Sequence, residues 1–525
     1  MTWEEIAKNK KQEVFGKIPS KWIIEVPSIE SFPNANDYIE SILTEKELEI
    51  TNGTISSTLD KLSTGEMKAL DVIEAFCHRV AILHQLCNCL SEIFFDEAFE
   101  RAKELDDYFE ENKKLRGKLH GIPISLKDQF NLPGIDSCLG FVANVGKPKT
   151  QEEMSLLAQD LYSEGCIFFV KTAVPTSLMS GDCYSNLHGS TLNAVNRYLS
   201  CGGSSGGEAT VVAGKGSLIG FGTDIGGSIR NPSSFTGIYG LKPSSDRLSY
   251  TGLTNTLMDH PVISSSVGPM CKSVEDLEYV TKILIDHQPW ENDAKVPPIP
   301  WKEVKLKDKL KIAVFIDKPN LKCQPSIRRS ILELIEKLKD HEVEIIDDKF
   351  PVDYDKISQV SGKLYGVNGY NDIKAKLEES GEKVEFLEYM SLFSSLSLDD
   401  EWELNKLKRE FQLKFYEFFK HYDCLVTPTF CETSYESGTY RFASSNSAFV
   451  NVLDFTAMTL PLGHAKETDV WPKDYVPEGE ANEELFKRFN ISRLKGAPVS
   501  VQVVGKRYDE ERVIEIIKLL DKLNK

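Results

Sequence analysis

The sequence predicts a single α/β domain, built on a large mixed and twisted β-sheet with helices on both faces. Short apolar stretches between Gly/Ser-rich turns alternate with segments of helical periodicity. The 525 residues, 41% of them hydrophobic, can bury a core without disulfides or metals. Length alone suggests about three domains. Neither a linker nor an internal repeat divides the chain, so one domain is the economical interpretation.

Residues 1–115 are expected to form a helical N-terminal extension packed on a core of residues 116–525. The stretch 70–94, "LDVIEAFCHRVAILHQLCNCLSEIF", places apolar residues at helical spacing, and a helix with a charged face follows it. Further on, buried strands are predicted over 166–174 and 217–225. The C-terminal half is predicted to contain strands over 311–316, 343–347 and 424–430, with helices over 326–341 and 397–422. The final segment, 496–523, is predicted as a strand, a turn and a helix.

Net charge argues against certain classes of partner, and cysteine content indicates the redox compartment. The net charge of −18 argues against nucleic acid or an anionic membrane surface. Eleven scattered cysteines without metal-ligand spacing favour free thiols in a reducing compartment. No apolar signal core or run of about 18 apolar residues is present. We therefore expect a cytoplasmic protein without a membrane anchor, a bound metal or a cofactor.

Three short segments carry candidate chemistry. Lys127 follows the apolar stretch "IPISL", where burial would lower its pKa until the neutral amine could act as a base. A surface lysine at a strand end is the alternative. In "CGGSSGGE", Ser204 and Ser205 each fit the pattern G-x-S-x-G. That pattern suggests either a glycine-rich turn or the nucleophile elbow of an α/β-hydrolase, which would need a later histidine as its base.

The third segment, "GTDIGGSIR", places a serine after two glycines. If Ser228 attacks a carbonyl group, nearby backbone N–H groups could surround the resulting oxyanion. The four candidate donors are Ile225, Gly226, Gly227 and Ser228. Asp224 and Arg230 flank the loop and are expected to hold it through an ion pair or hydrogen bonds.

Together, these segments resemble the amidase signature family. The family pattern runs through residues 201–244, and the resemblance also covers "GIPISLKDQF" (121–130) and "GAPVSVQVVG" (496–505). The stretch "WEEIAKNKKQEVFGKIPSKW" (3–22) is similar to the opening of fungal acetamidase-type members. Residues 116–525 would then form an amidase-signature catalytic domain.

The resemblance implies Ser228 as nucleophile, Ser204 as bridging serine and Lys127 as base. It also implies a cis peptide bond before Ser204. The reaction would pass through an acyl-enzyme on Ser228 and release a carboxylate and ammonia, with no cofactor. Lys242, the other lysine considered as a base, is interpreted as structural.

The expected substrate is a small neutral amide such as acetamide. Fatty-acyl or aryl amides (indoleacetamide-like) are the alternative, followed by a serine esterase or a catalytically silent binding protein. Residues 434–455 are expected to contribute to the acyl pocket. A homodimer stays open as the assembly.

Overall fold

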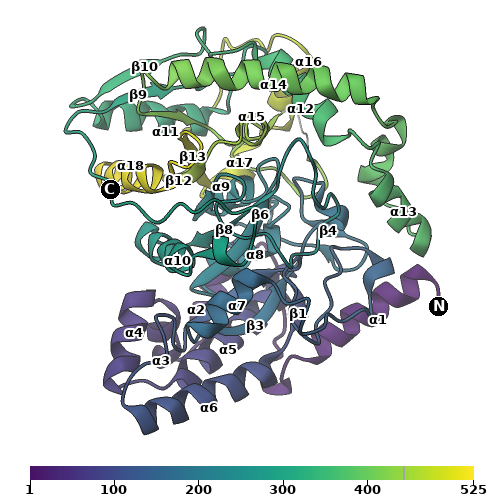
Figure 1. Ribbon diagram of the computed structural model, residues 1–525, viewed down its shortest axis with the longest axis vertical. Helices are drawn as coiled ribbons and strands as arrows, with labels where there is room; N and C mark the ends of the chain where they lie inside the picture. The colour runs from purple at the N-terminus through teal and green to yellow at the C-terminus, as the bar shows by residue number, and fades with distance from the viewer. Residues whose placement is uncertain (441–443) are drawn as a thin grey trace.

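One mixed β-sheet runs through the molecule (Figure 1). The computed structural model describes residues 1–440 and 444–525, apart from the side chain of Tyr389. In the described residues the sheet has 11 strands, in the order β1-β3-β2-β6-β8-β7-β12-β13-β11-β9-β10. Its strands are β1 (Leu90–Ile93), β2 (Pro123–Lys127), β3 (Ile167–Thr172), β6 (Ile219–Asp224), β7 (Tyr239–Lys242), β8 (Ser266–Cys271), β9 (Lys311–Val314), β10 (Glu342–Ile345), β11 (Cys424–Thr427), β12 (Ala457–His464) and β13 (Pro498–Val504). A separate hairpin pairs β4 (Tyr184–Ser185) with β5 (Gly189–Ser190).

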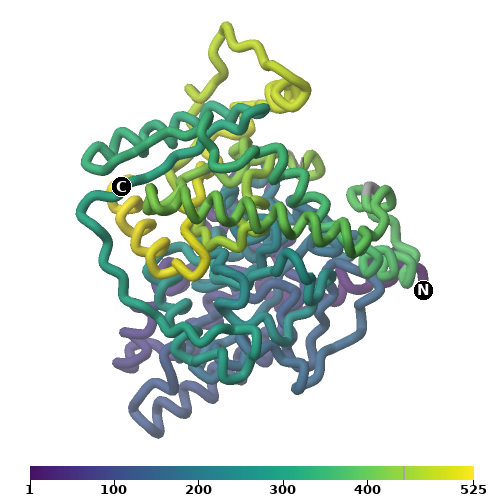
Figure 2. Tube along the Cα trace, turned by 45° about the horizontal axis from the view of Figure 1, so that its top comes forward, coloured from purple at the N-terminus to yellow at the C-terminus, as the bar shows by residue number. Residues whose placement is uncertain are grey.

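Helices flank the sheet along its length. Those of the N-terminal half are α1 (Trp3–Gly16), α2 (Ala35–Ile42), α3 (Glu45–Thr51), α4 (Ile55–Thr64), α5 (Ala69–Cys87), α6 (Phe95–Asn112), α7 (Leu156–Ser163), α8 (Gly206–Ala213) and α9 (Arg230–Thr236). Those that follow are α10 (Val274–Asp286), α11 (Pro325–Lys337), α12 (Tyr354–Tyr365), α13 (Asn371–Ser380), α14 (Leu398–Phe418), α15 (Ala448–Leu453), α16 (Glu480–Arg488), α17 (Ile491–Leu494) and α18 (Glu510–Asn524). The segment between β12 and β13, which includes α16, extends from the body at the top of Figure 2.

The predicted α/β architecture is confirmed. Strands β3, β6, β9, β10, β11 and β13 and helices α11, α14 and α18 lie where the sequence predicts them. β2, β3, β6 and β13 are buried along their whole length, as expected for strands covered on both faces. The sheet is mixed because β6 runs parallel to β2 and antiparallel to β8.

The stretch 70–94 differs from its prediction as one helix. Helix α5 ends at Cys87, and Asn88 adopts a left-handed conformation with φ of 54°. The chain turns there into β1, which pairs antiparallel with β3 at the edge of the sheet. Residues 1–115 therefore supply a strand as well as helices, and the sheet is continuous across position 115. Periodicity missed this change because β1 has only four residues and follows the largely buried α5 after a short turn.

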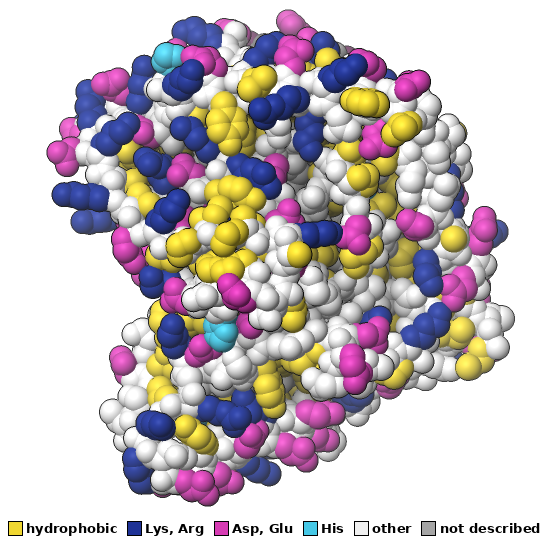
Figure 3. All heavy atoms as spheres, viewed as in Figure 1, with side chains coloured by type: hydrophobic (Ala, Val, Ile, Leu, Met, Phe, Trp, Pro, Cys, Tyr) yellow, Lys and Arg dark blue, Asp and Glu magenta, His cyan; other side chains and the backbone are white. Residues whose placement is uncertain are grey.

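The surface carries charges of both signs (Figure 3). Acidic and basic side chains are interspersed on the face seen in Figure 3, with no basic stripe. Across the described residues, we find no helix with the length and apolarity that crossing a bilayer requires. All eleven cysteines are buried free thiols, as predicted.

Candidate active site

Two neighbouring parallel strands bring the candidate residues to one edge of the sheet. β2 ends at Lys127 and β6 ends at Asp224, and Leu126 pairs with Phe221 between them. Because the strands are parallel, their carboxyl ends lie at the same edge. The loop carrying Ser228 follows β6 directly, so Lys127 and Ser228 approach each other although about a hundred residues separate them.

Lys127 is fully buried and held between two hydroxyl groups. Its Nζ lies 2.8 Å from Ser204 Oγ and 2.8 Å from Thr223 Oγ1. Burial lowers the pKa of Lys127 from 10.5 to about 7, against an opposing contribution from Asp224. The lysine is therefore a buried base candidate, not a surface residue at a strand end. A large share of it is the neutral amine near pH 7.

The two serines of "CGGSSGGE" have different environments. The peptide bond between Gly203 and Ser204 is cis, and Ser204 faces Lys127. Ser205 lies at the start of α8 and donates its N–H to Ser228 O at 3.1 Å. Its Oγ lies 3.3 Å from Thr223 O. Ser204 thus fits a role in proton transfer, while Ser205 holds the Ser228 loop in place.

The loop before Ser228 depends on a glycine and on a buried ion pair. Gly227 has φ of 120°, and a Cβ there would lie 2.6 Å from the Cβ of Ser447. Asp224 Oδ1 and Oδ2 each accept a hydrogen bond from Arg230 at 3.0 Å, and both side chains are fully buried. Burial alone would raise the pKa of Asp224, but the guanidinium holds it well below its ordinary value. The ion pair expected to hold this loop is present.

One of the four predicted oxyanion donors already has an acceptor. The Gly227 N–H donates to Asp224 Oδ1 at 2.8 Å. The Asp224 carboxylate caps the turn between β6 and α9 by accepting hydrogen bonds from several backbone N–H groups. The Gly227 N–H is one of them, so it is removed from the set of oxyanion donors that face the pocket. We correct the candidate set to Ile225, Gly226 and Ser228.

A small pocket of about 10 Å³ joins the two candidate serines. It is lined by Leu178, Met179, Ser204, Thr223, Ile225, Ser228, Asn255, Thr256, Leu257 and Ser265. No histidine occurs among these described residues, which argues against the α/β-hydrolase alternative. Residues 434–455 do not contribute to this lining where they are described. Residues 441–443 of that segment lie outside the described residues.

Comparisons with known proteins identify the family of this chain. The family model described as Amidase matches residues 71–514. The chain is 33% identical to an acetamidase of Aspergillus oryzae, over 99% of both chains. It is also 33% identical to an acetamidase of Emericella nidulans, over 99% of this chain and 98% of that one. The chain belongs to the amidase signature family. As a member, it is an enzyme that hydrolyses amides.

A solved structure extends the likeness to three dimensions. The amidase superposes on a structure titled fatty acid amide hydrolase with a TM-score of 0.93 and 30% sequence identity. The match covers 99% of this chain and 95% of the other. The likeness therefore includes the N-terminal helices, which precede the matched family region.

Glu208 of the amidase is a buried acid that the sequence analysis did not single out. It lies on α8, where its Oε2 accepts a hydrogen bond from Thr172 Oγ1 at 2.7 Å and its Oε1 contacts Ser125 Oγ. Burial raises the pKa of Glu208 to about 8, while the two hydroxyl contacts oppose the shift. A glutamate in the first turn of a helix is an ordinary sequence feature, so only its burial reveals it.

Two other polar groups of the amidase have structural roles. Lys242 Nζ donates to Phe455 O at 2.7 Å, which fits the structural interpretation of this lysine.

The second polar group is a potential metal-binding cluster, formed by Glu92, Asp136 and Cys138. Lys10 Nζ lies 2.7 Å from Glu92 and 3.7 Å from Asp136, however, so an ammonium group takes the position of a cation.

Proposed function

We propose that this amidase hydrolyses small neutral amides, such as acetamide, through a Ser228–Ser204–Lys127 relay. The observation that carries the proposal is the buried contact of 2.8 Å between Lys127 Nζ and Ser204 Oγ, at a pocket that Ser228 also lines. A serine hydroxyl needs a base to become a nucleophile. Here a lysine amine with a pKa of about 7 supports that role.

In the proposed mechanism, the neutral Lys127 amine accepts the Ser204 proton while Ser204 accepts the proton of Ser228. The Ser228 oxygen attacks the amide carbonyl, and the C=O electron pair moves onto the oxygen. The N–H groups of Ile225, Gly226 and Ser228 stabilise that oxyanion. The relay returns a proton to the departing nitrogen, so ammonia leaves and an acyl-enzyme remains. Water then attacks the ester by the reverse proton transfers, releasing the carboxylate.

The preference for small amides rests on the two acetamidase relatives and not on the volume of the pocket. Its side chains include Leu178, Met179 and Leu257, which close the space near Ser228 to about 10 Å³. A space of that volume holds about one water molecule, so even acetamide enters only when these side chains move. The two acetamidases at 33% identity support the same class of substrate. A longer acyl amide is the second candidate because of the likeness to the fatty acid amide hydrolase structure.

Ammonia release from a panel of amides tests both the relay and the substrate. The panel runs from acetamide through hexanamide, benzamide and indoleacetamide to a long-chain amide. We expect release from the short amides, and its loss in Lys127→Ala and in Ser228→Ala. Ser63→Ala, at an exposed position on α4, is the matched control and should retain activity. Near-wild-type activity of Lys127→Ala would contradict the relay, whereas preference for the long-chain amide would contradict only the substrate.

A further inference from the structure

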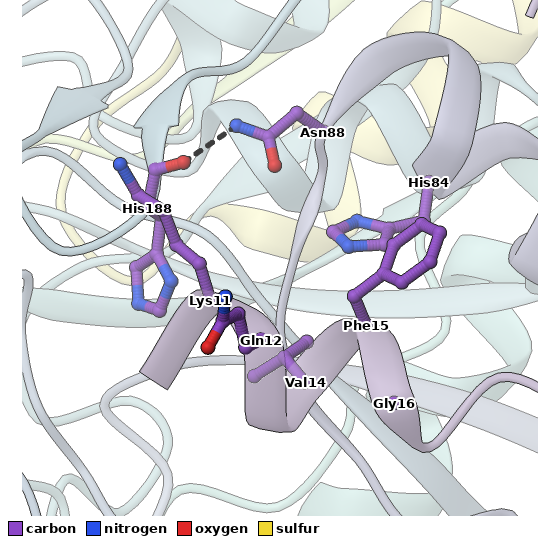
Figure 4. Close-up of a pocket in the computed structure, with 8 residues that line it drawn as sticks. All are labelled: Lys11, Gln12, Val14, Phe15, Gly16, His84, Asn88 and His188. Carbon is purple, nitrogen blue, oxygen red and sulfur yellow. Dashed lines mark hydrogen bonds between the residues drawn. The ribbon is translucent and has the colours of Figure 1, made fainter. Parts of the chain in front are cut away.

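A second and larger cavity lies against the N-terminal helix. Its volume is about 380 Å³, within the range of ligand pockets in proteins. Residues of α1, the C-terminal end of α5 and the turn between β4 and β5 line it, as Figure 4 shows. None of the eight lining residues touches the pocket at Ser228, so this cavity is separate from the proposed active site.

One side of this cavity presents an unpaired cation. The Lys11 side chain extends from α1 toward His188 (Figure 4) and makes no ion pair or hydrogen bond with the described residues. Partial burial lowers the pKa of Lys11 below its ordinary value, as expected for an ammonium without a counter-ion. No aspartate or glutamate lies among the lining residues. The cavity therefore has a positive charge that nothing within it neutralises.

Two buried imidazole rings add hydrogen-bonding capacity. His84 Nδ1 accepts the N–H of Leu90 at 3.1 Å, so in the neutral ring the proton is on Nε2. His188 is 5% exposed, and its buried Nε2 has no hydrogen-bond partner among the described residues. Burial lowers the pKa of each ring to about 4, so both are neutral at pH 7. The Nε2–H of neutral His84 can donate to a ligand without adding charge, whereas His188 Nε2 is closed off from the cavity.

Two apolar side chains also line the cavity. Val14 and Phe15 lie on the α1 side, and Phe15 is 46% exposed although it borders a cavity. Asn88 fixes the opposite wall, because its Nδ2 donates to His188 O at 2.7 Å and to Ser190 O at 3.0 Å. A ligand with an apolar body would cover the Phe15 ring and gain from that burial.

We propose that this cavity binds a monocarboxylate with a compact apolar body. The carboxylate pairs with the Lys11 ammonium and accepts from an imidazole N–H, while the body packs on Val14 and Phe15. One uncompensated cation matches one negative charge, and the mainly apolar wall disfavours a phosphate. Carboxylates are also the class of acid that amide hydrolysis releases, so the enzyme's own products fall within this class.

Fluorescence titration with 2-naphthoate tests the site, with naphthalene-2-methanol as the neutral counterpart. The naphthyl group fits a cavity of about 380 Å³, whereas the pocket at Ser228 would have to open to admit it. We expect Lys11→Met to weaken naphthoate binding about tenfold and to leave the alcohol unaffected, because only the acid makes a charge-assisted contact. Phe15→Ala should weaken both. Lys8→Met, an exposed lysine on the same helix, is the matched control and should change neither.

Each outcome decides the proposal. An unchanged melting temperature of Lys11→Met shows that the variant is folded, so its loss of affinity can be assigned to the charge. No saturable binding of naphthoate overturns the site. Equal affinity in wild type and Lys11→Met does the same. If Met179→Ala alters the affinity and Lys11→Met does not, the probe binds at the active-site pocket and the proposal is wrong. None of these outcomes depends on the serine relay being correct.

Discussion

Lys127 Nζ lies 2.8 Å from Ser204 Oγ and 2.8 Å from Thr223 Oγ1, in a region closed to solvent. Both contacts can be made by a neutral amine, which accepts one hydroxyl proton while donating to the other oxygen. The surrounding protein therefore accommodates the uncharged form of a lysine that would be charged in water. That property has a direct consequence for the pH dependence of the enzyme.

The activity of the wild type should rise with pH through about 7. The relay needs the neutral amine, and burial lowers the pKa of Lys127 to about 7, so protonation below that value removes the base. We expect kcat/KM for acetamide to fall about tenfold per pH unit below the pKa and to level off above it. A rate profile measured with stopped ammonia assays checks this.

Lys127→Arg serves as the control for the same profile. Its guanidinium stays protonated throughout, so we expect no measurable activity at any pH. A wild-type profile that is flat between about pH 5.5 and 8.5 would contradict a titrating Lys127 base. A profile that rises only near the ordinary lysine value of 10.5 would show that burial does not shift this group.

Shortening Met179 should broaden the choice of acyl group. Met179 lines the small pocket beside Leu178 and Ser228, and replacing it with alanine removes its three terminal side-chain heavy atoms from that space. Each methylene in a hydrophobic pocket changes discrimination by about 1–3 kcal/mol. We therefore expect the ratio of kcat/KM for hexanamide over acetamide to rise at least about tenfold in Met179→Ala.

The matched control for that change is Met154→Ala, a partly buried methionine outside the pocket. It should leave the substrate ratio unchanged. If Met179→Ala lowers both rates equally, the side chain positions the loop and does not limit the acyl group. Steady-state kinetics on the two amides distinguish these outcomes.

Most of the sheet could be predicted from the sequence because buried strands leave a local signal. The stretches that become β3 and β6 are short, apolar and bounded by Gly/Ser-rich turns. β12 left no such signal, since Pro461 and Gly463 interrupt it and its register shifts between them. Its pairing with β13 and β7 depends on segments far away in the chain, which periodicity does not detect.

The candidate site, like the sheet, could be predicted from the sequence only in part. The motifs indicated Lys127, Ser204 and Ser228 as candidates, but not which N–H groups of the loop stay available. The donation from Gly227 to Asp224 depends on where the carboxylate lies after folding. The lining of the pocket by Met179 and Leu257 also comes from loops without a distinctive pattern. Tertiary placement, not residue type, decides these features.

Neutralising one member of the Asp224–Arg230 pair should destabilise the enzyme strongly. Asp224→Asn leaves the Arg230 guanidinium buried without its counter-ion, and breaking such a pair typically costs about 3–5 kcal/mol. We expect a matching loss in the free energy of unfolding, measured in urea. The double variant Asp224→Asn/Arg230→Gln, which removes both charges, should be less destabilised than the single one.

An exposed ion pair provides the comparison. Glu110 and Lys113 lie 2.7 Å apart at the surface, with 63% and 70% of their side chains exposed. Exposed pairs contribute about 0–1 kcal/mol, so Glu110→Gln should change the unfolding free energy little. Equal losses for Glu110→Gln and Asp224→Asn would show that burial of the Asp224–Arg230 pair has no special energetic role.

Glu208 should make the stability of the wild type fall as pH rises. Its pKa is raised from 4.5 to about 8 in the folded enzyme, so the folded state keeps a proton that the unfolded chain loses. Stability from this group is fully present below about pH 4.5 and is lost progressively up to about pH 8. Glu208→Gln cannot ionise, and its amide can donate to Ser125 Oγ while its oxygen accepts from Thr172.

Between pH 5 and pH 8, the free energy of unfolding of Glu208→Gln should therefore increase relative to that of the wild type, by on the order of a few kcal/mol. The variant thus becomes the more stable of the two as pH rises. Urea unfolding at both pH values measures the difference, and Glu100→Gln, an exposed position on α6, is the control and should show no such trend. A parallel pH dependence in wild type and Glu208→Gln would mean that this carboxyl is already ionised in the folded enzyme. In that case its negative charge would stabilise protonated Lys127, and the lysine base would need a higher pH to act.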